Sequence, residues 1–201
     1  MKKNITRLLS AALTLMAVAM LASCLKDDTK TLTEEELMQA VAEMAGDYTG
    51  SVIVGMQTAY GTMPIDTIEN ITWHSDTILT IDNFPVATLA NAVTGRPELQ
   101  TAIKDAQKSL TLKNGYGFSA HQAKAENFFL YPENIKLNLH YGDADHTVEF
   151  GFYQGPGNYG TFNGDKQYFV LNLNGMAIDG QLVEAVNIRT LGFYFSSDKK
   201  Q

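Results

Sequence analysis

The feature that most constrains the fold is a change of hydrophobic period at Asp47. From there on, polar and apolar side chains alternate along short runs, a pattern typical of strands with one buried face. The nine runs are 47–56, 67–74, 77–81, 109–113, 127–131, 135–141, 146–153, 167–174 and 186–195. Asn-Gly pairs at 114–115, 163–164 and 174–175 indicate turns between them. The sequence therefore predicts a mainly β (α+β) domain, an antiparallel meander, barrel or sandwich.

Helical patterns interrupt this alternation at two places. Thr33 and Glu36 have the spacing of a capping box and predict a helix over 34–45. Between 85 and 107 apolar residues again recur at helical spacing, with Pro85 and Pro97 at plausible first positions. We expect this short helical insertion to cover a barrel mouth or a sheet edge.

One hairpin can be registered from its apolar residues. With residues 142–145 as a four-residue loop, Tyr141 would face His146, and the pairs Leu139 with Val148, Leu137 with Phe150 and Ile135 with Phe152 would follow. All large apolar residues then lie on one face, and the other face is polar. In this register His140 and His146 lie on opposite faces, so they cannot share a metal ion.

The first 23 residues have the layout of an export signal. Lys2, Lys3 and Arg7 precede an apolar run over 8–21, which is shorter than the roughly 20 residues of a membrane-spanning helix. We therefore expect 1–23 to be removed.

The tetrapeptide Leu21-Ala22-Ser23-Cys24 resembles the lipobox of bacterial lipoproteins. The resemblance implies cleavage before Cys24, a diacylglycerol on its sulfur and acyl chains such as palmitate that anchor the protein in a membrane. Two or three acyl chains give stable anchoring where one does not. The predicted organisation is a lipoprotein signal peptide (1–23), a lipidated tether (24–32) and a single β domain (33–201) with the helical insertion 85–107.

The residues after the cysteine indicate which membrane and which side. Leu25 stands where an Asp would resemble an inner-membrane retention signal, so the outer membrane is favoured. Lys26, Asp27 and Asp28 resemble the surface-export signal of Bacteroidetes-type lipoproteins, which implies display on the cell exterior. A periplasm-facing protein with a merely solvated tether is the second choice.

Charge and cysteine content exclude several classes of partner. The chain has a net charge of −7, and removal of the basic export segment makes the remainder more acidic, so nucleic acid is not an expected partner. Cys24 is the only cysteine. The domain therefore has no disulfide and no thiolate metal site.

Residues 46–50, Gly-Asp-Tyr-Thr-Gly, resemble the first strand of lipocalin-like, calycin-type barrels. In that family an Arg in the last strand packs over the aromatic ring of the first, and Arg189 would do so over Tyr48. The chain departs from the family in having Tyr48 where Trp is usual and in its helical insertion. The resemblance implies a barrel whose interior commonly holds a small apolar ligand.

The segment 155–160 matches the spacing of a dinucleotide-binding glycine motif but is not followed by a helix. We interpret it as a mobile loop between strands. Its aromatic residues Tyr153, Tyr159 and Phe162 are candidates for stacking on sugar rings.

No catalytic or metal-binding pattern is found. The histidines, His74, His121, His140 and His146, lack metal-ligand spacing, and Asp143 with Asp145 fits turn chemistry better than Ca²⁺ binding. We therefore predict no catalytic residue, no metal site and no cofactor.

The expected function is non-catalytic binding of a small apolar ligand, a glycan or a protein partner by an outer-membrane lipoprotein. One alternative is a hydrolytic enzyme acting on extracellular polymers, which would need clustered titratable side chains in one cleft. Another is a structural or interaction subunit of an envelope complex, which would present an exposed apolar patch.

Overall fold

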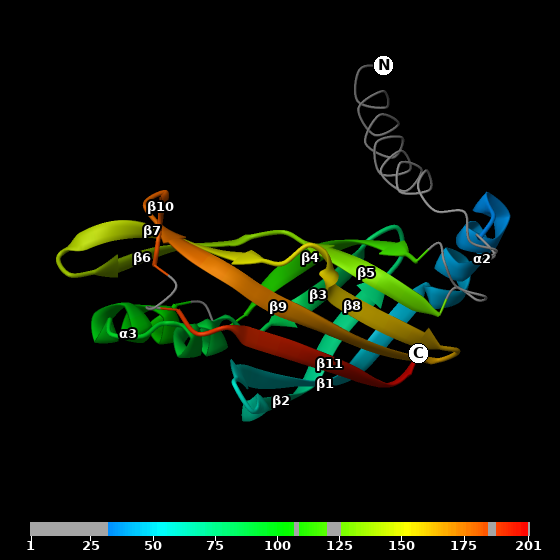
Figure 1. Cartoon of the computed structure of the whole chain (residues 1–201), viewed down its shortest axis with the longest axis horizontal. Coiled ribbons are helices and arrows are strands. Elements are labelled where there is room, and N and C mark those ends of the chain that lie inside the picture. Colours follow the sequence, from blue (N-terminus) through cyan, green and yellow to red (C-terminus); the bar gives the residue numbers. More distant parts are fainter. Residues whose placement is uncertain (1–31, 107–108, 120–125, 185–187, 201) are drawn as a thin grey trace, which may run out of the picture.

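The computed structural model describes residues 32–106, 109–119, 126–184 and 188–200, and its centre is a closed antiparallel β-barrel (Figure 1). Around the barrel the strands follow the order β1, β2, β3, β4, β5, β8, β9 and β11. The ring closes because β11 pairs with both β1 and β9. The predicted fold class, a mainly β, lipocalin-like barrel, is confirmed.

The strands are β1 (Gly46–Thr58), β2 (Gly61–Ser75), β3 (Leu79–Phe84), β4 (Leu110–Phe118), β5 (Asn127–Pro132), β6 (Ile135–Tyr141), β7 (Ala144–Phe152), β8 (Gly155–Asn163), β9 (Lys166–Ile178), β10 (Gln181–Leu182) and β11 (Leu191–Lys200). The helices are α2 (Glu34–Met44), the 3₁₀ helix η2 (Val86–Ala92) and α3 (Pro97–Asp105).

Strand β9 connects the barrel to a sheet extension. Its first part pairs with β8 and β11, whereas its second part, from Leu173 to Ile178, pairs with β7. Strand β6 pairs with β7 and ends the sheet order, and β10 pairs with the end of β9. The β6–β7 hairpin thus lies at one end of the long axis and α2 at the other (Figure 1).

Aromatic side chains fill the interior of the barrel. The ring of Trp73 stacks on Tyr48 with centroids 5.9 Å apart, and Phe169 and Phe195 meet it edge-on at 5.4 and 6.0 Å. All four side chains are buried, as predicted for Trp73. The close packing of a protein core therefore continues through the centre of the barrel.

The helix α2 begins as the sequence predicts. The Thr33 hydroxyl accepts a hydrogen bond from the backbone N–H of Glu36, and the Glu36 carboxylate accepts one from the backbone N–H of Thr33, which together form the capping box. The helix ends at Met44, one residue before the predicted end, and the Tyr48 hydroxyl donates to the Met44 carbonyl at 2.7 Å. This contact ties the end of α2 to the first barrel strand.

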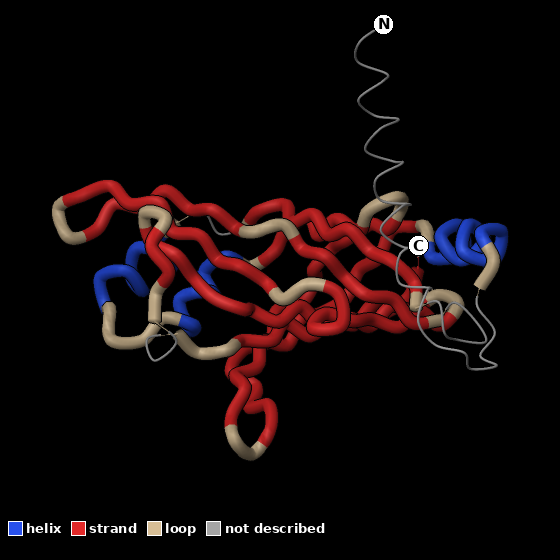
Figure 2. Tube along the Cα trace, turned by 45° about the horizontal axis from the view of Figure 1, so that its top comes forward, coloured by secondary structure: helices blue, strands red, loops and turns tan. Residues whose placement is uncertain are grey.

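The predicted helical insertion forms η2 and α3. Pro97 occupies the first turn of α3, as expected, whereas Pro85 precedes η2 as its N-cap. Leu99 and Ile103 of α3 are buried. The two helices lie beside the sheet extension, at the end of the molecule remote from α2 (Figures 1 and 2).

The predicted register of the β6–β7 hairpin is wrong by two residues. Tyr141 pairs with Ala144, so the turn contains only Gly142 and Asp143. Both have positive φ, 58° and 65°, as a two-residue type I′ turn requires. A shift of two preserves the faces, so His140 and His146 do lie on opposite sides.

Three local predictions about turns and loops are also wrong. Residues 155–160 belong to strand β8 and are not a mobile loop. The pairs Asn114-Gly115 and Asn174-Gly175 lie inside β4 and β9, where neighbouring strands continue the hydrogen bonding. The turn predicted at Asn163-Gly164 is correct, because β8 ends at Asn163 and Gly164 lies in the turn to β9.

The prediction that Arg189 covers Tyr48 is wrong. Arg189 precedes β11 and is exposed, and its backbone N–H donates to the Ala92 carbonyl at 2.7 Å. Tyr48 pairs with Lys200 at the other end of β11, whereas Met56 pairs with Leu191. Eight strand residues at about 3.3 Å each separate Tyr48 from Met56, which pairs with Leu191 close to Arg189. The ring of Trp73, not a guanidinium, packs on Tyr48.

Candidate functional site

The residues on which the predicted lipidation and surface export depend lie outside the described part of the chain. These are Cys24 with its lipobox and the export residues Lys26, Asp27 and Asp28. Lipidation and surface export therefore stay predictions. The described chain begins at Leu32, directly before α2.

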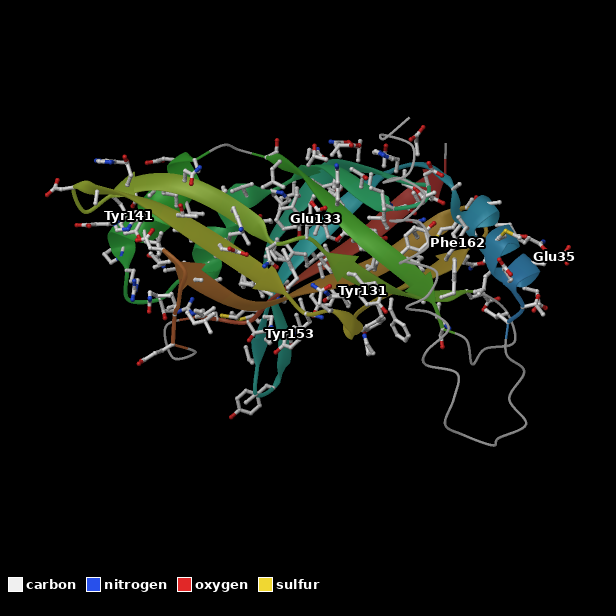
Figure 3. The ribbon with its side chains drawn as sticks, turned by 90° about the horizontal axis from the view of Figure 1, so that it is seen from above. Glu35, Tyr131, Glu133, Tyr141, Tyr153 and Phe162 are labelled. Atoms are coloured by element: carbon white, nitrogen blue, oxygen red, sulfur yellow. The ribbon has the colours of Figure 1, made fainter. Side chains whose placement is uncertain are left out.

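The three aromatic candidates for sugar binding do not form one surface. Tyr153 and Tyr159 have 42% and 56% of their surface exposed, but Phe162 has only 7% and belongs to the core. Along β8, residues 159 and 162 face opposite sides of the strand. Phe162 therefore lies among the core side chains, and Figure 3 shows it far from Tyr153.

Exposed tyrosines instead gather on the outer surface of β5, β8 and β9. Tyr131 and Tyr168 are exposed together with Tyr153 and Tyr159. Tyr153 lines a small depression of about 280 Å³ with Gln57, Gly157, Asn172 and Thr190. The Asn172 side-chain amide donates to the Gly157 carbonyl at 2.7 Å, which fixes one wall.

A larger depression is a groove between α3 and β6. Its volume is about 850 Å³, within the range of small-ligand sites. One wall consists of residues 136–142, and the other of α3 with its C-cap, namely Pro97, Glu98, Thr101, Ala102, Asp105 and Ala106. Residues three and four apart share one helix face, so this is a second face of α3, next to the face of Leu99 and Ile103.

The polar face of β6 is held by side chains of β7. The direct cross-strand pairs are Lys136 Nζ with Glu149 Oε2 at 3.3 Å, Asn138 Oδ1 with Thr147 Oγ1 at 3.2 Å, and His140 Nδ1 with Asp145 Oδ1 at 2.8 Å. Lys136, Asn138 and His140 line the groove, and their polar side-chain groups contact β7.

The α3 wall supplies negative charge. Glu98 and Asp105 line the groove, and among the described residues neither carboxylate has an ion-pair partner. A Cβ placed on Gly142 would lie 3.4 Å from Glu98 Oε2, so Glu98 stands beside the hairpin turn. The groove thus offers carboxylates along α3 and an extended backbone along β6.

Two carboxylates fix the β6–β7 hairpin to its neighbours. Asp179 accepts hydrogen bonds from His146 Nδ1 at 2.7 Å and from the backbone N–H of Thr147 at 2.9 Å, and both lower the pKa of Asp179. The pKa of Glu149 is lowered mainly by the hydrogen bond that Asn134 Nδ2 donates to it at 2.7 Å. These contacts hold β7 to the turn after β9 and to the segment before β6.

Sequence reasoning missed the groove, although signals for both walls exist. The second face of α3 and the wet face of β6 are visible as periodicities, but which elements meet is not. Among the described residues, no group of three or more His, Cys, Asp and Glu side chains could hold a metal ion. In the same residues no helix is long and apolar enough to span a membrane.

The comparisons with known proteins give one match. A family model, described as a domain of unknown function (DUF4840), matches residues 43–179. The matched segment runs from the end of α2 through β9 and includes both walls of the groove. No curated protein and no solved structure matches the chain.

Proposed function

We propose that this chain, which belongs to the DUF4840 family of domains of unknown function, is a lipid-anchored outer-membrane protein that binds a protein partner without transforming it. The anchor rests on the lipobox at Leu21-Ala22-Ser23-Cys24, and display on the cell exterior rests on Lys26, Asp27 and Asp28. Binding rests on the groove between α3 and β6.

The observation that carries the proposal is the position of the groove. The described chain starts beside α2, at one end of the long axis, and α3 with the β6–β7 hairpin lies at the other (Figure 1). A tether that enters at α2 would leave the groove directed away from the membrane. A binding protein on a short anchor needs its site at that end.

The interior of the barrel is filled with side chains, which favours a binding site on the outer surface. Trp73, Phe84 and Phe193 are buried inside the domain, and the ring centroids of Phe84 and Phe193 are 4.9 Å apart. A small apolar ligand would have to displace such side chains, which costs several kcal/mol for each large group. The groove requires no such rearrangement.

Site-specific photo-crosslinking in intact cells tests the binding function. A photoreactive amino acid at Thr101, an exposed α3 residue in the groove, should give a defined protein adduct, and one at Thr67 on exposed β2 should not. Asp105→Trp should abolish the Thr101 adduct by filling the groove. Lys104→Trp, which places the same bulk on α3 outside the groove lining, should leave it. An absent adduct, or one insensitive to Asp105→Trp, would contradict the proposal.

The predicted lipid anchor and surface display have a separate test. Because Cys24 is the sole cysteine, Thr67→Cys, on the exposed part of β2 outside the groove, adds the only thiol that acylation of Cys24 leaves free. A membrane-impermeant maleimide should label it on intact cells. Replacing Lys26, Asp27 and Asp28 by alanine should restrict labelling to lysed cells. Membrane association should be lost in Cys24→Ala, and retention there would exclude the lipid anchor.

A second candidate function, glycan binding, is favoured by the depression beside Tyr153. An exposed ring next to the amides of Gln57 and Asn172 suits a sugar, which has both an apolar face and hydroxyl groups. Soluble oligosaccharides of envelope polysaccharide should then quench tyrosine fluorescence in the wild type. They should fail to bind Tyr153→Ala, with Tyr60→Ala at the tip of the β1–β2 hairpin as the matched control. Equal binding by both variants would exclude this site.

A further inference from the structure

The open edge of strand β6 can recognise an extended backbone. We propose, on the basis of the binding function above, that the partner contributes an extended, basic segment that adds to β6 as a further strand, against α3. Addition of a strand to an exposed sheet edge is a common mode of peptide recognition.

The hairpin turn determines which backbone groups of β6 face the groove. In a two-residue turn the closing pair, here Tyr141 and Ala144, is hydrogen-bonded, and hydrogen-bonded pairs then alternate along the ladder. Leu139 and Leu137 therefore bond to β7. The N–H and C=O groups of Lys136, Asn138 and His140 point to the open edge, which gives a strand-shaped array of donors and acceptors.

Side chains leave this edge unobstructed. Lysine side chains often protect exposed edges, but the Lys136 ammonium group lies 3.3 Å from Glu149 on β7. The His140 ring is likewise directed to Asp145 on β7. The edge is also regular, since β6 pairs with β7 over seven consecutive residues without a register shift.

The α3 wall selects the chemistry of the segment. Glu98 and Asp105 supply negative charge, with Ala102 between them as a small apolar surface. Glu98 and Asp105 are about 10 Å apart along the helix at 1.5 Å per residue. Strand positions i and i+4 are about 13 Å apart and share one face. A segment with Lys or Arg at i and i+4, and a small apolar residue at i+2, matches this wall.

The probe follows from this pattern. The synthetic peptide Thr-Lys-Thr-Val-Thr-Lys-Thr should bind the full-length protein in detergent, as measured by isothermal titration calorimetry. A peptide with Glu in place of both Lys residues should bind at least about tenfold more weakly because it faces Glu98 and Asp105. A peptide with N-methylated backbone amides should also lose at least about tenfold, since it cannot donate to the edge.

Matched variants assign the binding to each wall. Asn138→Pro removes an outward N–H without touching the β6–β7 ladder and should weaken binding about tenfold, whereas Asn138→Val should not. Glu98→Gln with Asp105→Asn should weaken binding of the basic peptide about threefold to tenfold. Urea unfolding of each variant verifies that the fold is retained.

Several results would overturn strand addition. They are absence of binding by the basic peptide, equal binding of its N-methylated form, or insensitivity to Asn138→Pro. A wild-type dimer that Asn138→Pro converts to a monomer without peptide would identify a second copy of this chain as the occupant. If the Thr101 photo-adduct persists while the peptide fails, groove binding stands and strand addition alone is wrong. If the adduct is absent, the binding function itself fails.

Discussion

Two hairpins, β1–β2 and β6–β7, project from the barrel (Figures 2 and 3). Their outer edges differ in strand pairing. Strand β2 pairs with β3 only at Trp73, His74 and Ser75, so most of its length is also an outer edge. Its pairing with β1 skips Ile65 and Asn70, and Pro64 removes a donor. Strand β6 carries neither a bulge nor a proline.

The difference shows that this domain protects one long edge and leaves another regular. Bulges and prolines are the ordinary means by which an edge strand is kept from pairing with other chains. The outer edge of β2 carries two bulges and a proline, whereas the outer edge of β6, which faces α3, carries neither. Because the same chain uses these devices at β2, their absence from β6 favours a role for that edge in recognition.

The largest expected effect tests whether the backbone groups of successive β6 residues alternate between bonding to β7 and facing the open edge. Leu139→Pro should destabilise the fold by about 4 kcal/mol or more, because it removes a ladder donor and a buried side chain. Asn138→Pro should cost less than about 1 kcal/mol, because its N–H faces outward. Urea unfolding measures both. Leu139→Ala measures the cost of losing the side chain alone. Equal losses of unfolding free energy in Leu139→Pro and Asn138→Pro would refute the alternation.

The two hairpins should also differ in their contribution to the core. Phe150 of β7 is completely buried, and Phe150→Ala should cost about 3–5 kcal/mol. Met63 near the tip of β1–β2 is half exposed, and Met63→Ala should lie within about 0.5 kcal/mol of the wild type. Similar values in thermal or urea unfolding would mean that the β6–β7 hairpin is not an integral part of the fold.

A smaller effect tests the bulge that protects β2. Asn70 has a φ of 59°, a left-handed conformation that asparagine tolerates and β-branched residues do not. Asn70→Val should destabilise by about 1–2 kcal/mol, and Asn70→Gly should be neutral within about 0.5 kcal/mol. Unfolding free energies check both, and a neutral Asn70→Val would show that the bulge is not held in this conformation.

The sequence shows which faces are buried more reliably than it shows registers. The capping box of Thr33 and Glu36 was predictable because all its interactions are local. The β6–β7 register was missed by two residues, since apolar alternation specifies only the face, and Gly142-Asp143 lacks the common Asn-Gly order.

Contacts between distant elements were the least predictable. Strand β8 was missed because its glycines indicate a loop, yet Gly160 is required where the Phe128 ring would lie 2.4 Å from an added Cβ. The groove joins residues 97–106 to residues 136–142, and no local pattern shows that they meet. The sequence placed Phe162 among exposed aromatics for the same reason.

The smallest effect is a response to acid confined to the β6–β7 hairpin. The pKa of Asp179 is lowered by its hydrogen bonds from His146 and Thr147, so its contribution to stability is present above the unfolded pKa of about 3.9 and lost as the pH falls through the folded pKa. Amide NMR shifts of Thr147 should move in this acidic range, and those of Met63 should not. Asp179→Asn should remove the response, and its persistence there would assign it to another carboxyl.

Residue-resolved hydrogen exchange of the β6 backbone tests the open edge most directly. In the free protein the amides of Lys136, Asn138 and His140 should exchange fast, and those of Leu137, Leu139 and Tyr141 should be protected. Saturation with the Thr-Lys-Thr-Val-Thr-Lys-Thr peptide should slow the first set and leave the second unchanged. Uniform protection in the free protein, or no change on saturation, would contradict an edge that receives a strand.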